Sequence, residues 1–169
     1  MLLAGDAIVL AGATGRVGGA TLATLVREGA RVLVLSRSEQ RARAAIDGLL
    51  DGDEAAAAIP FACDAGDPAQ TERAVAACIE RFGRVDALVS LAGGSKVVPL
   101  ADSSLADLRD NVRGHLETSY NLALPALRAM LAQPYREGAR SRGRMVVGPP
   151  GRHASPRRAA RCSARRRPR

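Results

Sequence analysis

The segment VLAGATGRVGGA, residues 9–20, joins a run typical of a buried strand to a run with helical spacing. The residues that lead into it are apolar throughout, as in a strand covered on both faces of a sheet. Apolar residues then recur with the period of an amphipathic helix. Gly12, Gly15 and Gly18 form a GxxGxxG pattern at the junction. The segment therefore predicts a strand, a tight glycine turn and a helix in succession.

This junction has the arrangement that a dinucleotide-binding turn requires. Gly12 allows the tight turn, Gly15 lets the backbone approach a pyrophosphate, and Gly18 lets the helix pack close to the sheet. The phosphates would lie at the helix N-terminus, where free N–H groups and the helix dipole favour anions. The alternative is a structural turn that binds no ligand. The predicted loop residues are Gly12, Ala13, Thr14, Gly15, Arg16, Val17 and Gly18.

Strand-like and helix-like segments alternate along the rest of the chain, with Ser38 and Asp67 as candidate N-caps. The alternation predicts an α/β fold, a doubly wound parallel sheet of the Rossmann type with strand order 3-2-1-4-5. Met145-Val146-Val147 reads as a buried strand, yet its outer edge is left unpaired and apolar, so we expect a sheet that is incomplete at its C-terminal edge. The predicted strands are 7–12, 31–36, 58–64, 85–94 and 144–148, and the predicted helices are 17–29, 38–50, 67–83 and 103–132.

The net charge of +8 is distributed unevenly along the chain. Residues 1–135 hold 13 basic and 16 acidic residues, a net charge of −3, whereas residues 136–169 hold 12 arginines and one acid, a net charge of +11. We expect one nucleotide-binding domain over 1–148 and a disordered, arginine- and proline-rich tail over 149–169. Because the body is mildly acidic, the composition does not indicate a nucleic-acid-binding protein.

The three cysteines, Cys63, Cys78 and Cys162, lie far apart and show no metal-ligand spacing, so neither a metal site nor a disulfide framework is predicted. We expect incidental thiols in a reducing compartment, and therefore a cytoplasmic protein. The N-terminus lacks a basic region and its apolar run is broken by Asp6, so it reads as the first strand and not as a signal peptide. No apolar stretch approaches the roughly 20 residues of a membrane span.

The end of the second predicted strand indicates which dinucleotide is preferred. An NAD-specific domain usually places a carboxylate here to hold the ribose 2′-OH, but this chain has Ser36 and Arg37. A guanidinium suits a 2′-phosphate, so we expect NADP over NAD, with Arg16 as a second contributor. The alternative is that Arg37 is a solvated surface residue.

Over residues 5–148 the sequence resembles the short-chain dehydrogenase/reductase family. The glycine loop departs from the main branch of that family, because Ala11 replaces a Thr and Arg16 replaces the middle Gly. The resemblance implies an NAD(P)-dependent oxidoreductase that acts on a carbonyl or alcohol substrate, and it allows homo-oligomers because helices of this family commonly pair in dimers.

Three further motifs follow in the family's order. Asp64 stands where the family has an Asp that contacts the adenine, and Ala92-Gly93 match part of its Asn-Asn-Ala-Gly motif. Asn111, in NVRG, stands at the position of a catalytic-site Asn that helps to organise a proton-relay water. Two structural alternatives stay open: Asp64 caps a loop, and Asn111 marks a helix kink or a surface position.

The family's catalytic Tyr-x-x-x-Lys does not occur in these 169 residues, since Tyr135 is the last tyrosine and Lys96 is the one lysine. Three interpretations follow: a truncated or frame-shifted reductase that is catalytically incompetent, a non-enzymatic NADP-binding protein whose basic tail meets acidic partners, or a reductase that uses other residues. The first is preferred, because alanine codons shifted by one base encode Arg, Pro and Gly, which is the character of the tail. The enzyme status and the substrate stay open.

Overall fold

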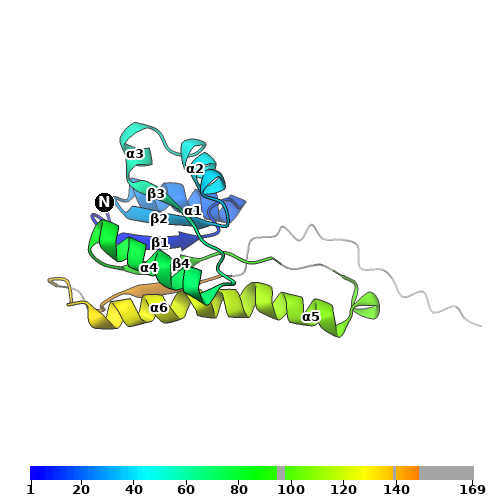
Figure 1. The fold of residues 1–169 in the computed structure, drawn as a ribbon. Helices are drawn as coiled ribbons and strands as arrows, with labels where there is room; N and C mark the ends of the chain where they lie inside the picture. The colour runs from blue at the N-terminus through cyan, green and yellow to red at the C-terminus, as the bar shows by residue number, and fades with distance from the viewer. Residues whose placement is uncertain (95–97, 139, 149–169) are drawn as a thin grey trace, which may run out of the picture.

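The computed structural model describes residues 1–94, 98–138 and 140–148, so Lys96, Cys162 and the predicted tail lie outside it. Strands and helices alternate through most of its length (Figure 1). The strands are β1 (Ala7–Ala11), β2 (Arg31–Ser36), β3 (Ala58–Ala62), β4 (Ala87–Ser90) and β5 (Arg144–Val147). The helices are α1 (Arg16–Arg27), α2 (Glu39–Asp47), α3 (Gly52–Ala56), α4 (Pro68–Phe82), the 3-10 turn η1 (Leu100–Asp102), α5 (Leu105–Val112), the π-helical turn η2 (Arg113–Glu117) and α6 (Thr118–Ala132).

The five strands form one parallel sheet in the order β3-β2-β1-β4-β5, which confirms the predicted topology. At the centre, Val9 of β1 lies beside Leu33 of β2 and Leu88 of β4. Parallel pairing brings the carboxyl ends of all the strands to one edge of the sheet, where ligands bind in folds of this class. The loops that follow the strands therefore meet at this shared edge.

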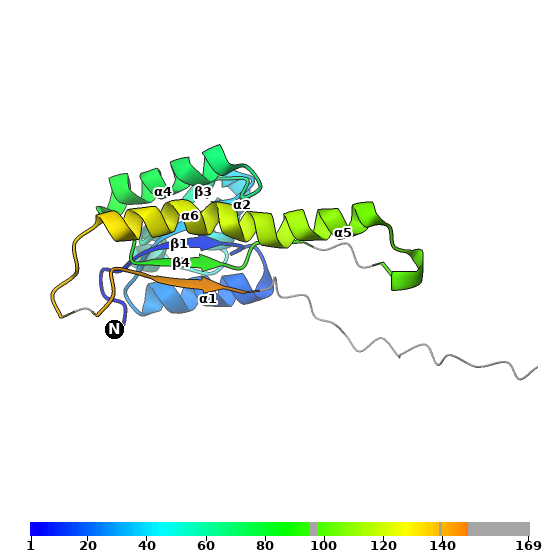
Figure 2. The ribbon, with the colours of Figure 1, turned by 90° about the horizontal axis from the view of Figure 1, so that it is seen from below.

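Helices cover both faces of the sheet, as Figure 2 shows. On one face α4 and α6 pack over Val9 and its neighbours, and on the other α1 and α2 pack over Ile8 and Leu10. Because successive strand residues point to opposite faces, an apolar strand such as β1 fills both cores at once. This explains why the run at 7–12 shows no polar alternation.

The predicted helix starts at Ser38 and Asp67 are confirmed. The Ser38 hydroxyl accepts a hydrogen bond from the Arg41 N–H at 3.4 Å, and an Asp67 carboxylate oxygen accepts one from the Ala69 N–H at 2.9 Å. Pro68 occupies the first turn of α4, where its missing N–H costs nothing. The short helix α3 was not expected, because its five residues are too few to show a period.

The prediction that Met145-Val146-Val147 is buried is wrong. All four residues of β5 are exposed, with Val146 at 55% and Val147 at 53%. The strand pairs with β4 along one side, and no other strand among the described residues pairs with its second side. A short apolar strand at the edge of a sheet has the same kind of sequence as one at the centre, so the pattern did not distinguish exposed from buried side chains.

The predicted helix over 103–132 consists of α5, η2 and α6 in succession. Figures 1 and 2 both show α6 lying along the sheet and α5 continuing past the carboxyl ends of the strands. None of the helices in the described part of the chain is both long enough and apolar enough to cross a bilayer. The π-helical turn between α5 and α6 lies beside the loop that follows β4, at the carboxyl edge of the sheet.

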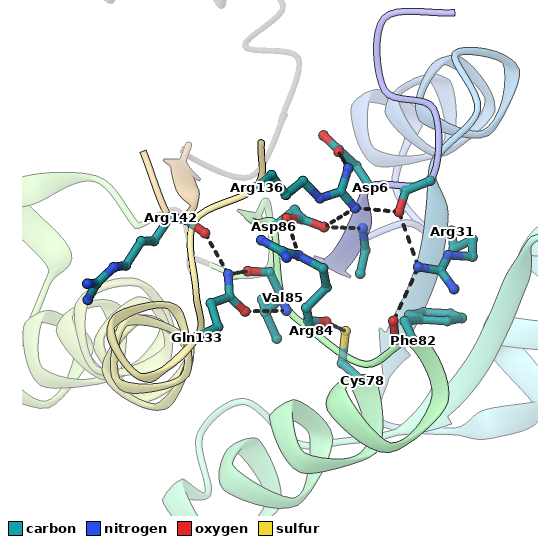
Figure 3. Close-up of polar contacts among 12 residues, drawn as sticks. Asp6, Arg31, Cys78, Phe82, Arg84, Val85, Asp86, Gln133, Arg136 and Arg142 are labelled. Atoms are coloured by element: carbon teal, nitrogen blue, oxygen red, sulfur yellow. Dashed lines mark hydrogen bonds and ion pairs between the residues drawn. The ribbon is translucent and has the colours of Figure 1, made fainter. Parts of the chain in front are cut away.

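A charged cluster closes the opposite, amino-terminal edge of the sheet (Figure 3). Asp86 accepts hydrogen bonds from the Arg84 side chain at 2.7 Å, from Arg136 at 3.0 Å and from the Ala7 N–H at 2.9 Å. Arg136 also pairs with Asp6 at 2.8 Å. Both carboxylates are buried, so these partners supply the compensation that a buried charge requires. The cluster ties the segment before β5 to the start of β1.

Candidate functional site

The carboxyl ends of the strands open into a cleft of about 780 Å³. Its walls are the loops that follow β1, β2, β3 and β4, together with one side of α5, η2 and the start of α6. The lining residues are Ala11, Gly12, Thr14, Gly15, Arg16, Val17, Gly18, Leu35, Ser36, Arg37, Arg41, Cys63, Asp64, Ala65, Gly66, Asp67, Leu91, Ala92, Gly93, Gly94, Asp110, Arg113, Gly114 and Thr118.

Two glycines of the loop after β1 are required by packing. Gly12 has φ of +95°, and a Cβ placed there would lie 2.6 Å from the backbone carbonyl carbon of Leu91. A Cβ on Gly18 would collide with the carbonyl oxygen of Gly12. The first glycine therefore permits the turn against the loop after β4, and the second lets α1 begin directly over that turn.

Gly15 differs from both. Its φ of −91° is available to any residue, and a Cβ placed there would meet the Gly12 oxygen at an ordinary 3.5 Å. It is the N-cap of α1, and it lines the cleft. Neither the turn nor the packing requires a glycine here, so what its missing side chain preserves is free space on the cleft wall.

The N-terminus of α1 faces that free space. Within the described residues no side chain caps this helix, and its first turn carries no acidic residue. The backbone N–H groups of the first turn and the helix dipole therefore favour an anion at this end of the cleft.

Cationic side chains surround the loop after β2. Arg16, Arg37 and Arg41 are exposed and line the cleft. Within the described part of the chain, no hydrogen bond or ion pair engages any of their guanidinium groups. Ser36 also lines the cleft, and its hydroxyl oxygen accepts a long 3.5 Å hydrogen bond from the Ser38 N–H. This wall therefore presents unneutralised positive charge together with a hydroxyl group.

Carboxylates occupy the loop after β3. Asp64 accepts a hydrogen bond from the Gly66 N–H at 2.9 Å, and its own N–H donates to the Gln70 side chain at 2.9 Å. The side chain therefore does cap its loop, which was the alternative to a role at the adenine. The Gln70 side chain also donates to Asp67 at 2.8 Å, and this hydrogen bond holds the pKa of the Asp67 carboxyl below its ordinary value.

Cys63, the first residue after β3, is a buried thiol that also lines the cleft. Burial, and next the negative charges of Asp64 and Asp67, raise the pKa of Cys63 to about 11. A thiol of this kind is a poor nucleophile at neutral pH because the thiolate is the reactive form. Among the described residues, no group of three metal-ligating side chains gathers here or elsewhere.

The loop after β4 packs directly on the π-helical turn η2. A Cβ on Gly93 would lie 2.7 Å from the Nδ1 atom of His115, and a Cβ on Gly114 would lie 2.6 Å from the Gly94 oxygen. The Thr118 hydroxyl donates to the Arg113 carbonyl at 3.0 Å, which satisfies an acceptor in the widened turn. Small residues on both sides therefore bring the two backbones into contact at this end of the cleft.

The structure gathers all but two of the predicted site residues around the cleft. Ala13 is buried beneath the glycine loop and is 2% exposed. Asn111, in the last turn of α5, is half-buried, and its side-chain oxygen has no partner within the described residues. It follows the lining residue Asp110 and lies two residues before η2 begins at Arg113, but it is not itself part of the lining.

Several lining residues escaped sequence reasoning. Arg41 lies in the first turn of α2, and Asp110, Arg113 and Thr118 come from a helical segment whose direction relative to the sheet the sequence does not show. Arg41 could have been found, because the N-cap at Ser38 places the first turn of α2 at the edge of the sheet where β2 ends.

Comparison with known proteins agrees with this architecture. The family model described as short chain dehydrogenase matches residues 6–147. D-threitol dehydrogenase of Mycolicibacterium smegmatis is 33% identical over 105 residues, which cover 62% of this chain and 40% of that protein. The human protein named dehydrogenase/reductase SDR family member 2, mitochondrial, is 33% identical over 145 residues, which cover 82% of this chain and 47% of that protein.

Among solved structures, a short chain dehydrogenase from Burkholderia cenocepacia in complex with NADP superposes with a TM-score of 0.66 at 28% identity, covering 76% of this chain and 52% of that one. The chain thus spans about half the length of the relatives it matches. The glycine turn at the carboxyl edge of a 3-2-1-4-5 sheet and the match over 6–147 lead to one conclusion: this chain belongs to the short chain dehydrogenase family.

Proposed function

We propose that the cleft binds a nicotinamide dinucleotide, NADP(H) in preference to NAD(H), as the cofactor-binding part of an oxidoreductase. The observation that carries the proposal is the free space at Gly15, where the N-terminus of α1 faces a cleft lined by arginines; within the described ranges neither this helix end nor these arginines have a side-chain partner. An anionic ligand would supply the partners that these groups lack. The Burkholderia cenocepacia structure in complex with NADP supports the same assignment by likeness.

We assign the parts of the cofactor by strand order, since β2 and β3 lie on one side of β1 and β4 on the other. The pyrophosphate would lie against residues 15–18, the 2′-phosphate beside Ser36 and Arg37, and the adenine beside Asp64. Ala92 and Gly93 would border the nicotinamide end, where the lining residues of the loop after β4 are small. When bound, the nicotinamide supplies hydride transfer to or from a carbonyl or alcohol.

Asn111 stands as a positioning residue in this proposal. Its buried side-chain oxygen has no partner among the described residues, and a buried acceptor without a partner costs free energy. A water or a neighbouring hydroxyl that it orients near the nicotinamide end would remove that cost. A proton donor is still needed, and neither Tyr120 nor Tyr135 is followed by a lysine four positions later. We therefore propose that these 169 residues bind the cofactor without efficient turnover.

Titration of the full chain with NADPH and with NADH, followed by nicotinamide fluorescence, tests the assignment. We expect saturable binding of one cofactor per chain with tighter binding of NADPH. Arg37→Asp removes the cation and adds a carboxylate suited to a ribose 2′-OH, so it should invert the preference. Equal affinities in the unmodified chain, or tighter binding of NADH, would reject the assignment of NADP(H).

A further inference from the structure

Arg41 is placed where its charge is unfavourable for the helix that carries it. It is the third residue of α2, within the first turn, where the positive end of the helix dipole repels a cation. Glu39, by contrast, has the sign that this turn favours. The backbone N–H of Arg41 is already satisfied by the Ser38 hydroxyl at 3.4 Å, so capping does not require the arginine side chain.

The guanidinium of Arg41 has no partner within the described residues. It is exposed and lines the cleft, as do Arg37 and Ser36 of the loop that precedes α2. The other cation of the helix, Arg43, is equally exposed but does not line the cleft. Two guanidinium groups that have no partner among the described residues, and one hydroxyl, thus line the cleft within six residues of sequence at the positive end of α2. That arrangement suits a dianionic phosphate better than a single exposed arginine would.

We propose that Arg41 is a specificity-determining residue of this cleft, which binds the 2′-phosphate of NADP(H) together with Arg37. The inference rests on the proposed function, because it assigns a second cation to the cofactor proposed above. Arg41 contributes by charge-assisted hydrogen bonding to the phosphate, and the first-turn repulsion is relieved when the phosphate is bound. NADH lacks this phosphate and therefore gains nothing from Arg41.

A different role would leave a different signature. A guanidinium can also stack on the face of an adenine ring, and that contact would strengthen NADH and NADPH binding to the same degree. A solvated Arg41 would affect neither cofactor. The ratio of the two affinities therefore separates a phosphate contact from stacking and from solvation.

The experiment measures dissociation constants of NADPH, NADH, 2′,5′-ADP and 5′-AMP for the full chain and for Arg41→Ala, by calorimetry at two salt concentrations. Arg43→Ala is the matched control, since it removes the same charge from the same exposed helix away from the cleft. Thermal unfolding of each variant verifies folding, and alanine at either exposed helical position should preserve it. Arg41→Lys, which keeps the charge but not the planar fork, is a second variant.

We expect Arg41→Ala to weaken NADPH and 2′,5′-ADP by about tenfold, the scale of one charge-assisted hydrogen bond, and NADH and 5′-AMP by less than about twofold. The loss should shrink as salt is raised, and Arg43→Ala should change none of the four affinities. An unchanged NADPH:NADH ratio in Arg41→Ala, while the unmodified chain still prefers NADPH, would overturn the inference and leave the proposed function intact. Failure of the unmodified chain to bind either cofactor would overturn both.

Discussion

Substituting alanine at two glycines of the same loop should separate cofactor binding from folding. Gly12 and Gly15 are three residues apart, and each would gain one methyl group. The surroundings of that methyl differ. At Gly12 it would lie 2.6 Å from the Leu91 carbonyl carbon and 2.8 Å from the Ala92 nitrogen, both backbone atoms, at a φ of +95°. At Gly15 it would have one neighbour, at 3.5 Å.

The magnitudes follow from those distances. Gly12→Ala combines a backbone conformation that costs a side-chain-bearing residue about 1–3 kcal/mol with overpacking worth about 1–3 kcal/mol, so we expect the free energy of unfolding to fall by about 2–6 kcal/mol. Gly15→Ala has an ordinary conformation and an ordinary contact. Its stability should change by less than about 1 kcal/mol, because the restriction that alanine imposes on the unfolded chain offsets the weaker preference for alanine than for glycine at the N-cap of α1.

The affinity for NADPH should fall in Gly15→Ala even though the fold is preserved. The added methyl occupies the free space through which a pyrophosphate would approach the N-terminus of α1, so NADPH should bind at least about tenfold more weakly, or about 1.4 kcal/mol. Urea unfolding measures the stability, and fluorescence titration measures the affinity. A Gly15→Ala variant that binds NADPH as the unmodified chain does, or a Gly12→Ala variant of undiminished stability, would refute this account of the loop.

Three further predictions concern the rest of the chain. Asp86→Ala leaves Arg84, Arg136 and the buried Ala7 N–H without their shared carboxylate (Figure 3). The free energy of unfolding, measured in urea, should therefore fall by about 3 kcal/mol. Glu54→Ala, which breaks the exposed pair with Arg27, is the control and should lower it by less than about 1 kcal/mol. Burial raises the pKa of the Cys63 thiol to about 11 and that of the Cys78 thiol to about 12, above their unfolded values. The free energy of unfolding should therefore be unaffected by these thiols below about pH 9 and should fall as the pH rises through about 9–12. Cys78→Ala should make that decline shallower in urea-unfolding curves recorded across this range. The chain should oxidise NADPH no faster with a panel of ketones and aldehydes than without it, since general acid–base assistance is worth about 10²–10⁴-fold and no Tyr-x-x-x-Lys is present in the sequence; steady turnover that Asn111→Ala abolishes would contradict this.

The sequence predicted the sheet well because its signals are local. An apolar β1, a glycine turn and the caps at Ser38 and Asp67 each depend on residues within one turn of one another, and the strand order follows from the handedness of the connections. The unpaired outer edge of β5 was also expected, but the burial of its side chains, which depends on neighbours distant in the chain, was predicted wrongly. The exposure of the β5 side chains depends on which elements lie beside the strand, and the apolar sequence of the strand does not show this.

The site was predicted in the same uneven way. The residues of the glycine loop, Ser36 and Arg37 follow directly from strand ends, and the structure places them on the cleft. The wall made by Arg113 and Thr118 depends on a π-helical turn that forms where Gly93 and Gly94 press against the helix, a contact across some twenty residues of sequence. Ala13 was predicted from its place within the motif alone, and its side chain turns into the core instead.

Mapping of NADPH onto the backbone amides of the isotope-labelled chain by NMR tests the central claim most directly, because it asks where the cofactor binds and not only whether it binds. We predict that NADPH shifts the amide signals of residues 12–18, 36–41 and 91–94, and that NADH, whose ribose lacks the 2′-phosphate, shifts the first and third groups similarly but 36–41 by less. Saturable shifts that fall instead on β5 or on the far side of α6, or the absence of any shift at millimolar NADPH, would contradict the assignment of this cleft as the dinucleotide site.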